Sequence, residues 1–433
     1  MLTIDVHIEG VDGPAGALSR FDDGSTSFRY LRDDLPHPVS LSLPVREEPF
    51  GDTQVRGFFS NLLFENEMLE QVIRRHKVEP SDFVGLLFHL GADCPGAISC
   101  GPEGGGAPKA PGILSKDYRP VTADELNEIM KSLSDHRRMP AGQTDPSPLA
   151  GVQGKVALTK LPNGDFALPI QGRRVPTTHI LKVPRRTRMQ DVRLEHAAME
   201  AMAELQDHPV AFSKVIGEGD LQALLVERFD RRVEGDQVNR IHQEDFCQAL
   251  GLPAALKYER NADDRRPRFD AQAIGGIIAK TTQPGSTRLA MLKIALANLL
   301  LGNTDNHAKN HALLYRAYDP ELAPVYDVVP TIIDPDVTHE LAFRIGAAQM
   351  TDEITRDDLD AFAKALGMRA FTKAHQNIAC MMVEKAVEMM QDMRGPAKKR
   401  FSDALAEQGK HIQAAAGCGI TVPEGDLVII NRP

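Results

Sequence analysis

The most informative part of the sequence is Gly302-Asn303-Thr304-Asp305-Asn306-His307-Ala308-Lys309-Asn310, which is followed by Tyr326-Asp327. Asp305 and Asn310 have the Asp-x-x-x-x-Asn spacing of a kinase catalytic loop, and Asp327 lies where a second metal-binding carboxylate is expected. In such a loop one carboxylate orients a hydroxyl group, while an amide oxygen and a second carboxylate hold magnesium against the nucleotide phosphates. The spacing therefore predicts ATP-dependent phosphoryl transfer.

The segments around this loop predict a helical lobe. Residues 288–301 are almost wholly apolar, so we expect a buried helix that leads into the loop. The chain is mainly helical in pattern from about residue 243 onward, and residues 356–416 predict three helices.

Strand patterns dominate the middle of the chain. Two short runs, 155–158 and 166–170, are joined by Pro162-Asn163-Gly164-Asp165, which is a strong hairpin signal. Further elements are predicted as a strand over 178–183, a helix over 191–205 and a strand over 221–228. This order predicts a sheet that covers a nucleotide.

The N-terminal part predicts a small α/β module. Residues 1 to about 45 alternate polar and apolar positions between turn signals, which indicates short antiparallel strands. Helical spacing of apolar residues predicts helices over 58–76 and 82–90. Glycine and proline at 101–108 favour a linker that ends the module, with a phosphate-cradling loop as the alternative.

Composition limits the class of protein. With 433 residues, 42% hydrophobic and 25% charged, the chain fits a globular protein of two or three domains. The net charge of −10 argues against a general electrostatic grip on nucleic acid, because neutralising phosphates needs clustered Lys and Arg.

The cysteines and the apolar segments point to the cytoplasm. The cysteines are scattered and lack the short paired spacing of a zinc site, so we expect buried free thiols at Cys94, Cys100, Cys247, Cys380 and Cys418. We find no secretory signal and no apolar stretch long enough to span a bilayer. A reducing cytoplasm without membrane association is predicted.

Lys182 is a candidate phosphate ligand because it lies in the apolar strand predicted over 178–183. Burying an ammonium group without a partner is costly. Glu195, early in the next predicted helix, is a plausible ion-pair partner of the kind that kinases use. The alternative is a strand-edge lysine that points to water.

Gly151-Val152-Gln153-Gly154-Lys155 precedes the hairpin and could bring backbone amides close to phosphate oxygens. It is not a Walker A sequence, because Leu149 replaces the first glycine and Val156 replaces the magnesium-binding Ser or Thr. A P-loop NTPase is therefore disfavoured. An ordinary turn is the alternative for this segment.

Glu227-Arg228-Phe229-Asp230-Arg231 ends a predicted strand and could form the hinge where backbone groups meet adenine, or could be an exposed charged loop.

His307 could contact the nucleotide or be an ordinary loop histidine. Asp305, His307 and Asp327 could also form a metal-hydrolase site, but no second His-rich motif completes such a cluster.

At these residues the chain resembles the HipA family of bacterial serine/threonine kinases, the toxins of HipA–HipB type toxin–antitoxin modules. The similarity extends over nearly the whole chain. The stretches that carry it are Phe58-Phe59-Ser60-Asn61-Leu62-Leu63, Leu149-Ala150-Gly151-Val152-Gln153-Gly154-Lys155, Pro176-Thr177-Thr178-His179-Ile180-Leu181-Lys182, Val226-Glu227-Arg228-Phe229-Asp230-Arg231, Glu244-Asp245-Phe246-Cys247-Gln248-Ala249-Leu250-Gly251 and Thr304-Asp305-Asn306-His307-Ala308-Lys309-Asn310.

The resemblance implies an α+β, two-lobed protein-kinase-like fold with an N-terminal α/β subdomain and a mostly helical C-terminal lobe. The implied domains are a HipA N-terminal subdomain (1–106), a kinase N-lobe with phosphate loop and hinge (107–232) and a helical C-lobe with the catalytic loop (233–433).

The resemblance also assigns roles to residues. Asp305 would be the catalytic base, Asn310 and Asp327 the Mg²⁺ ligands, and Lys182 the phosphate-binding lysine. The expected ATP-binding residues are Ala150, Gly151, Val152, Gln153, Gly154, Lys155, Lys182, Glu227, Arg228, Phe229, His307, Lys309, Asn310, Tyr326 and Asp327.

The function implied by the resemblance is that of a toxin kinase. Family members phosphorylate proteins, such as an aminoacyl-tRNA synthetase, and thereby stop translation and slow growth, which leads to persistence. A HipB-like DNA-binding antitoxin would bind the chain and supply most of the contact with operator DNA. A catalytically silent kinase-fold co-repressor and a small-molecule or lipid kinase are the alternatives.

One position departs from the family pattern. The inhibitory autophosphorylation serine usually lies immediately before the Leu-Ala-Gly stretch, where this chain has Pro148. Ser147 lies one residue earlier, and we expect it to take over this role, because a phosphate there could still eject the loop from the ATP pocket.

Overall fold

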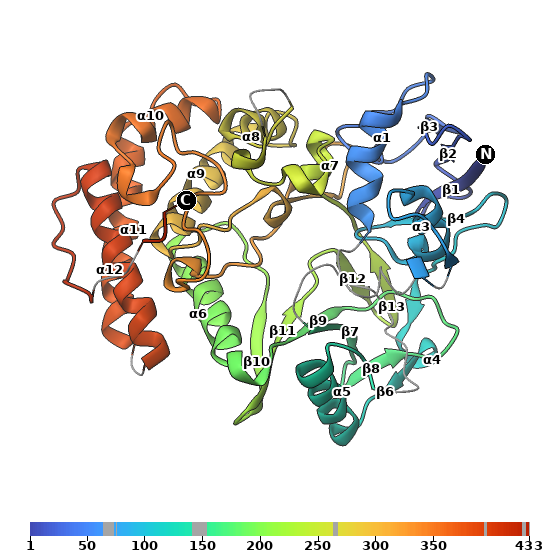
Figure 1. Ribbon diagram of the computed structural model, residues 1–433, viewed down its shortest axis with the longest axis horizontal. Coiled ribbons are helices and arrows are strands. Elements are labelled where there is room, and N and C mark those ends of the chain that lie inside the picture. Colours follow the sequence, from blue (N-terminus) through green and yellow to red (C-terminus); the bar gives the residue numbers. More distant parts are fainter. Residues whose placement is uncertain are drawn as a thin grey trace. The chain divides into compact units, whose positions relative to one another are not determined.

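The computed structural model describes residues 1–63, 73–74, 76–140, 154–262, 267–393, 396–426 and 430–432 (Figure 1). The chain divides into two compact units. The first comprises residues 1–192, 212–254 and 313–320, and the second comprises residues 193–211, 255–312 and 321–433.

The first unit begins with a four-stranded antiparallel sheet in the order β3-β2-β1-β4. Its strands are β1 (Leu2–Ile8), β2 (Gly16–Arg20), β3 (Thr26–Tyr30) and β4 (Ile98–Pro102). Helices α1 (Asp52–Phe59) and α3 (Phe83–Leu90) pack on the sheet and bury Phe28, Phe58, Phe59, Val84 and Leu87. The predicted N-terminal strands and the helix over 82–90 are confirmed.

Two predicted boundaries in this region were wrong. The helix expected over 58–76 begins at Asp52 and gives way after Phe59 to a 3₁₀ turn, Ser60–Leu62, while much of the remaining range lies outside the described residues. The expected linker at 101–108 starts too early, because Gly101 and Pro102 pair with Asp5 and Ile4 of β1.

A second sheet has six strands in the order β10-β11-β9-β7-β8-β6. They are β6 (Tyr118–Pro120), β7 (Gly154–Lys160), β8 (Phe166–Pro169), β9 (His179–Val183), β10 (Ser213–Glu218) and β11 (Leu221–Glu227). Helix α5 (Ala123–His136) starts at the N-cap Thr122 and packs its apolar side on this sheet. The predicted hairpin and the strands after it are confirmed.

Short elements connect the two sheets within the first unit. They are β5 (Gly112–Ile113), α4 (Leu114–Asp117), β12 (Arg231–Glu234), β13 (Gln237–Arg240), β14 (His242–Asp245), α7 (Phe246–Leu250) and β15 (Ala312–Tyr315). Helix α7 packs against α1, and β13 pairs with both β12 and β5.

The second unit is mainly helical. It contains most of α6 (Gln190–Leu205), and α8 (Ala271–Ile278), α9 (Pro284–Leu300), α10 (Arg356–Ala365), α11 (Lys373–Asp392), α12 (Pro396–Ala416) and the short strand β16 (Glu321–Leu322). Helix α9 is buried along most of its length and packs against α11 and α12. The predicted buried helix before the loop and the three C-terminal helices are confirmed.

The cysteine expectation holds for three residues and fails for two. Cys94, Cys100 and Cys247 are buried free thiols. Cys380 and Cys418 form a disulfide, because the packing of α11 against α12 brings their Cα atoms to 5.4 Å although 38 residues separate them in sequence. Every helix of the described residues is too short or too polar to cross a lipid bilayer.

A close backbone contact between α1 and the end of α7 generates a prediction. A Cβ atom on Gly57 would lie 2.0 Å from the carbonyl oxygen of Gly251, so the helices would have to separate. We expect Gly57→Ala to lower the free energy of unfolding by about 1–3 kcal/mol in urea denaturation. Gly276→Ala is the control, since its Cβ meets nothing within 4 Å and alanine should stabilise α8 by roughly 0.5–1 kcal/mol. Equal effects of the two changes would contradict the packing argument.

Candidate active site

The loop after α9 is held by a glycine turn and a buried amide. Gly302 has φ +67°, and a Cβ there would lie 2.3 Å from the Ile332 side chain, so only glycine fits without displacement. The Asn303 side chain donates to Asn298 Oδ1 of α9 at 2.7 Å. These contacts tie the start of the loop to the rigid helix.

Asp305 and Asn310 are joined within this loop. The Asn310 amide Nδ2 donates to the Asp305 main-chain oxygen at 2.9 Å, and His307 N donates to the same oxygen at 2.9 Å. Asn310 N donates to the His307 oxygen at 2.8 Å. Because the amide nitrogen of Asn310 is engaged in this way, its oxygen Oδ1 is left for another partner.

Tyr258 contacts Asp305 directly. Its hydroxyl donates to Asp305 Oδ1 at 2.6 Å, and burial together with this bond raises the pKa of Tyr258. The Arg260 guanidinium lies over the Tyr258 ring, 4.0 Å from its centroid, which holds the ring in place. Sequence reasoning missed Tyr258, because it lies 47 residues before Asp305 and belongs to no recognised motif.

His307 lies near both carboxylates of the site. Burial lowers its pKa, while the charges of Asp305 and Asp327 oppose that shift. Its ring packs edge-on against Tyr258 at 5.1 Å, and its Nδ1 atom has no hydrogen-bond partner in the described part of the chain. The imidazole is therefore neutral at pH 7 and keeps one ring nitrogen available.

Asp327 has an unusual backbone. Its φ is +59°, and among the described residues only Lys77 and Arg137 share a positive φ without being glycine. Arg137 is a helix C-cap, where this conformation is common, whereas Asp327 follows no helix. Strained backbone of this kind clusters at functional sites. Beside it, the Tyr326 hydroxyl donates to the Lys309 main-chain oxygen at 2.7 Å and so joins this segment to the loop.

The predicted phosphate-binding residues of the first unit lie on the six-stranded sheet. Lys182 of β9 is 8% exposed and is paired in register with Lys155 of β7, the strand that begins at Gly154. Glu195 is buried in α6, within the second unit. The remaining predicted loop positions lie outside the described residues and are Ser147, Ala150, Gly151, Val152 and Gln153.

The predicted hinge follows the end of β11. Glu227 N donates to the Phe212 oxygen at 2.9 Å, and Arg228 N donates to the Thr178 oxygen at 3.0 Å. The Arg228 guanidinium forms a two-point ion pair with Asp230 and is 7% exposed. Its charge is therefore engaged within the protein.

The described residues contain no group of three or more His, Cys, Asp or Glu side chains arranged to hold a metal ion. The Asn310 amide oxygen and the Asp327 carboxylate are oxygen donors of the kind that Mg²⁺ prefers when phosphates and water complete its shell. The donor set thus fits magnesium bound together with a nucleotide.

Comparisons with known proteins agree over most of the chain. A family model described as the HipA-like C-terminal domain matches residues 147–399, and one described as the HipA N-terminal domain matches residues 4–101. A candidate kinase of Sinorhizobium fredii, Y4mE, is 32% identical over 413 residues, which cover 92% of this chain and 96% of that protein.

A serine/threonine-protein kinase toxin, HipA of Shewanella oneidensis, is 31% identical over 382 residues, which cover 85% of this chain and 84% of the toxin. A solved HipA structure from Shewanella oneidensis MR-1, in a complex with HipB and operator DNA, matches with a TM-score of 0.74 and 27% identity, covering 95% of this chain and 96% of that one. This match confirms the predicted α+β, two-lobed protein-kinase-like fold. The chain belongs to the HipA family of serine/threonine-protein kinase toxins.

Proposed function

We propose that the protein is an ATP- and Mg²⁺-dependent serine/threonine-protein kinase that acts as the toxin of a toxin–antitoxin module. Its substrate would be a translation-related protein such as an aminoacyl-tRNA synthetase, and phosphorylation would cause growth arrest and persistence. Two relatives with over 30% identity are named as kinases, one of them as a toxin, which supports the proposal.

The observation that carries the proposal is the bond between the Asn310 side chain and the Asp305 main chain. It holds a carboxylate and an amide oxygen in one loop, with the amide oxygen not consumed by the bond. Phosphoryl transfer needs these two groups: one orients the attacking hydroxyl and the other holds the metal.

In the proposed mechanism Asp305 accepts the proton of the substrate hydroxyl. The Tyr258 hydroxyl occupies Oδ1, which orients the carboxylate and leaves Oδ2 for the substrate. Asn310 and Asp327 would hold magnesium, which when bound neutralises developing charge on the phosphates. The neutral His307 ring beside them can contact nucleotide without adding a positive charge.

Lys182, Lys155 and residues 150–154 would bind the phosphates, and Lys309 and Tyr326 would be further nucleotide-binding residues. The backbone of Glu227, Arg228 and Phe229 would meet the adenine. Autophosphorylation at Ser147, in place of the usual family serine, would inhibit the kinase.

The partner we propose is a HipB-like DNA-binding antitoxin. The solved HipA relative was found in a complex with HipB and operator DNA. Because this chain carries a net charge of −10, most of the phosphate contact in such a complex would come from the antitoxin. We propose that the assembly acts in the bacterial cytoplasm.

Replacing the proposed base generates the first functional prediction. Asp305→Asn keeps the shape of the side chain and the main-chain bond to Asn310 but removes proton acceptance. We expect the rate of radiolabelled γ-phosphate transfer to protein to fall by about 10²–10⁴-fold, while ATP binding is retained. Asp336→Asn, on an exposed residue of the same unit, should leave the rate unchanged. Equal transfer by wild type and Asp305→Asn would refute the assignment, and absence of transfer by wild type would favour a silent co-repressor.

Removing the Tyr258 hydroxyl generates the second functional prediction. Tyr258→Phe deletes the bond to Asp305 and keeps the ring beneath Arg260. We expect kcat to fall by about 10- to 100-fold, the scale of one hydrogen bond to a charged group, with the KM for ATP unchanged. Tyr318→Phe, an exposed position, is the control. A rise in KM with an unchanged kcat would show that Tyr258 acts on nucleotide binding and not on Asp305.

A further inference from the structure

A buried network of charges lies directly behind the hinge segment 227–229. Asp230 is 3% exposed, and its carboxylate accepts four hydrogen bonds. Arg228 donates through Nε at 3.0 Å and Nη2 at 2.9 Å, Arg231 donates through Nη1 at 2.7 Å, and the Gly96 amide donates at 3.3 Å. Four hydrogen bonds to one buried carboxylate hold this side chain in a single orientation.

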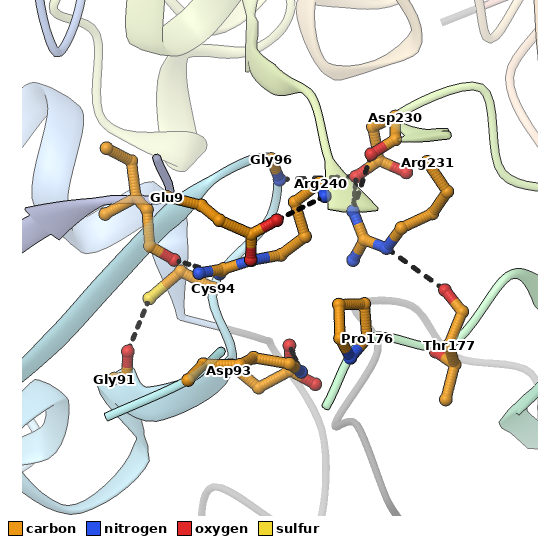
Figure 2. A network of polar contacts seen from close by, with 12 residues as sticks. Glu9, Gly91, Asp93, Cys94, Gly96, Pro176, Thr177, Asp230, Arg231 and Arg240 are labelled. Atoms are coloured by element: carbon orange, nitrogen blue, oxygen red, sulfur yellow. Dashed lines mark hydrogen bonds and ion pairs between the residues drawn. The ribbon is translucent and has the colours of Figure 1, made fainter. Parts of the chain in front are cut away.

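Arg231 extends the network to the sheet. Its Nε donates to the Thr177 oxygen at 3.0 Å, and its Nη1 also donates to the Asp230 main-chain oxygen at 2.9 Å (Figure 2). That oxygen accepts a further bond from Ile241 N at 2.9 Å. Both the side chain and the main chain of Asp230 are thus held.

The other end of the network lies in the N-terminal domain. Gly96, whose amide donates to Asp230, has φ +66°, and a Cβ there would lie 2.5 Å from Gln243 N, so only glycine allows this close approach to the Gln243 backbone. In the same region Arg240 pairs with Glu9 at 2.7 Å (Figure 2). Arg240 also donates to the Ile98 oxygen at 2.8 Å. A buried Lys109–Asp93 pair completes the set.

The charges are mutually dependent. Burial alone would raise the pKa of Asp230, but the Arg228 and Arg231 guanidinium groups lower it on balance. Burial, followed by repulsion from Arg228, lowers the pKa of Arg231 to about 10. The carboxylate is therefore charged at physiological pH.

We propose that Asp230 is a positioning residue for nucleotide recognition, which fixes the hinge backbone against the N-terminal domain. The inference rests on the proposed function, because it takes residues 227–229 as the adenine-contacting segment. The Arg228 side chain points inward to Asp230 and is hydrogen-bonded to it. The network within the protein, and not contact with the ligand, would therefore set the conformation of the segment's backbone. Adenine recognition through backbone groups requires such fixation, since a displacement of about 1 Å breaks a hydrogen bond.

The test separates positioning from simple stability. Asp230→Asn should raise the KM for ATP by about tenfold and reduce the preference for ATP over GTP by a similar factor, with kcat little changed. A merely structural role would lower the amount of active protein and so change the apparent kcat, but would leave KM and the ATP to GTP ratio as they are. Glu9→Gln is the matched control, because it breaks another buried ion pair of the network that does not touch the hinge.

A second variant covers the case in which Asp230→Asn does not fold. The triple variant Arg228→Met, Asp230→Leu, Arg231→Met removes the three charges together and replaces them with apolar side chains of similar size, a change that proteins often tolerate. It should fold and show the same rise in KM. A folded variant with wild-type KM and nucleotide preference would overturn the inference. If instead the wild-type protein neither bound nor used ATP, the proposed function itself would fail.

Discussion

The hydrogen bond from the Asn310 amide to the Asp305 main-chain oxygen is the constraint on which the site depends. Without it the Asn310 side chain, five positions after Asp305, would not be tied to the main chain of that residue. With it, the Asp305 carboxylate and the Asn310 amide oxygen belong to one loop and have fixed positions relative to each other. Catalysis by positioning requires this rigidity, because the groups that stabilise the transition state must be in place before the reaction begins.

Packing supports that loop from two directions. Helix α9 is buried between the C-terminal helices and ends at the Gly302 turn, so the loop starts from a fixed point. Tyr258 supports Asp305 from a segment earlier in the chain, and Tyr326 joins the Asp327 segment to the Lys309 backbone. Asp327, whose φ is positive, directly follows Tyr326.

Local patterns were predictable and long-range partners were not. The spacing of Asp305 and Asn310, the hairpin before Lys182 and the apolar helix before the loop can each be read from a short stretch of sequence. Tyr258 and the Cys380–Cys418 disulfide depend on segments that only folding brings together. Arg228 shows a third case: its place near the hinge was predicted, but a sequence does not reveal that a charged side chain points inward to Asp230.

The central claim is that Asp305, Asn310 and Asp327 form a magnesium–nucleotide site. A crystal structure with a non-hydrolysable ATP analogue and Mg²⁺ tests it most directly. We predict a magnesium ion about 2.0–2.1 Å from Asn310 Oδ1 and from an Asp327 carboxylate oxygen. The adenine should be hydrogen-bonded to the backbone of residues 227–229. A nucleotide bound at another place, or a metal ion without these two ligands, would contradict the account.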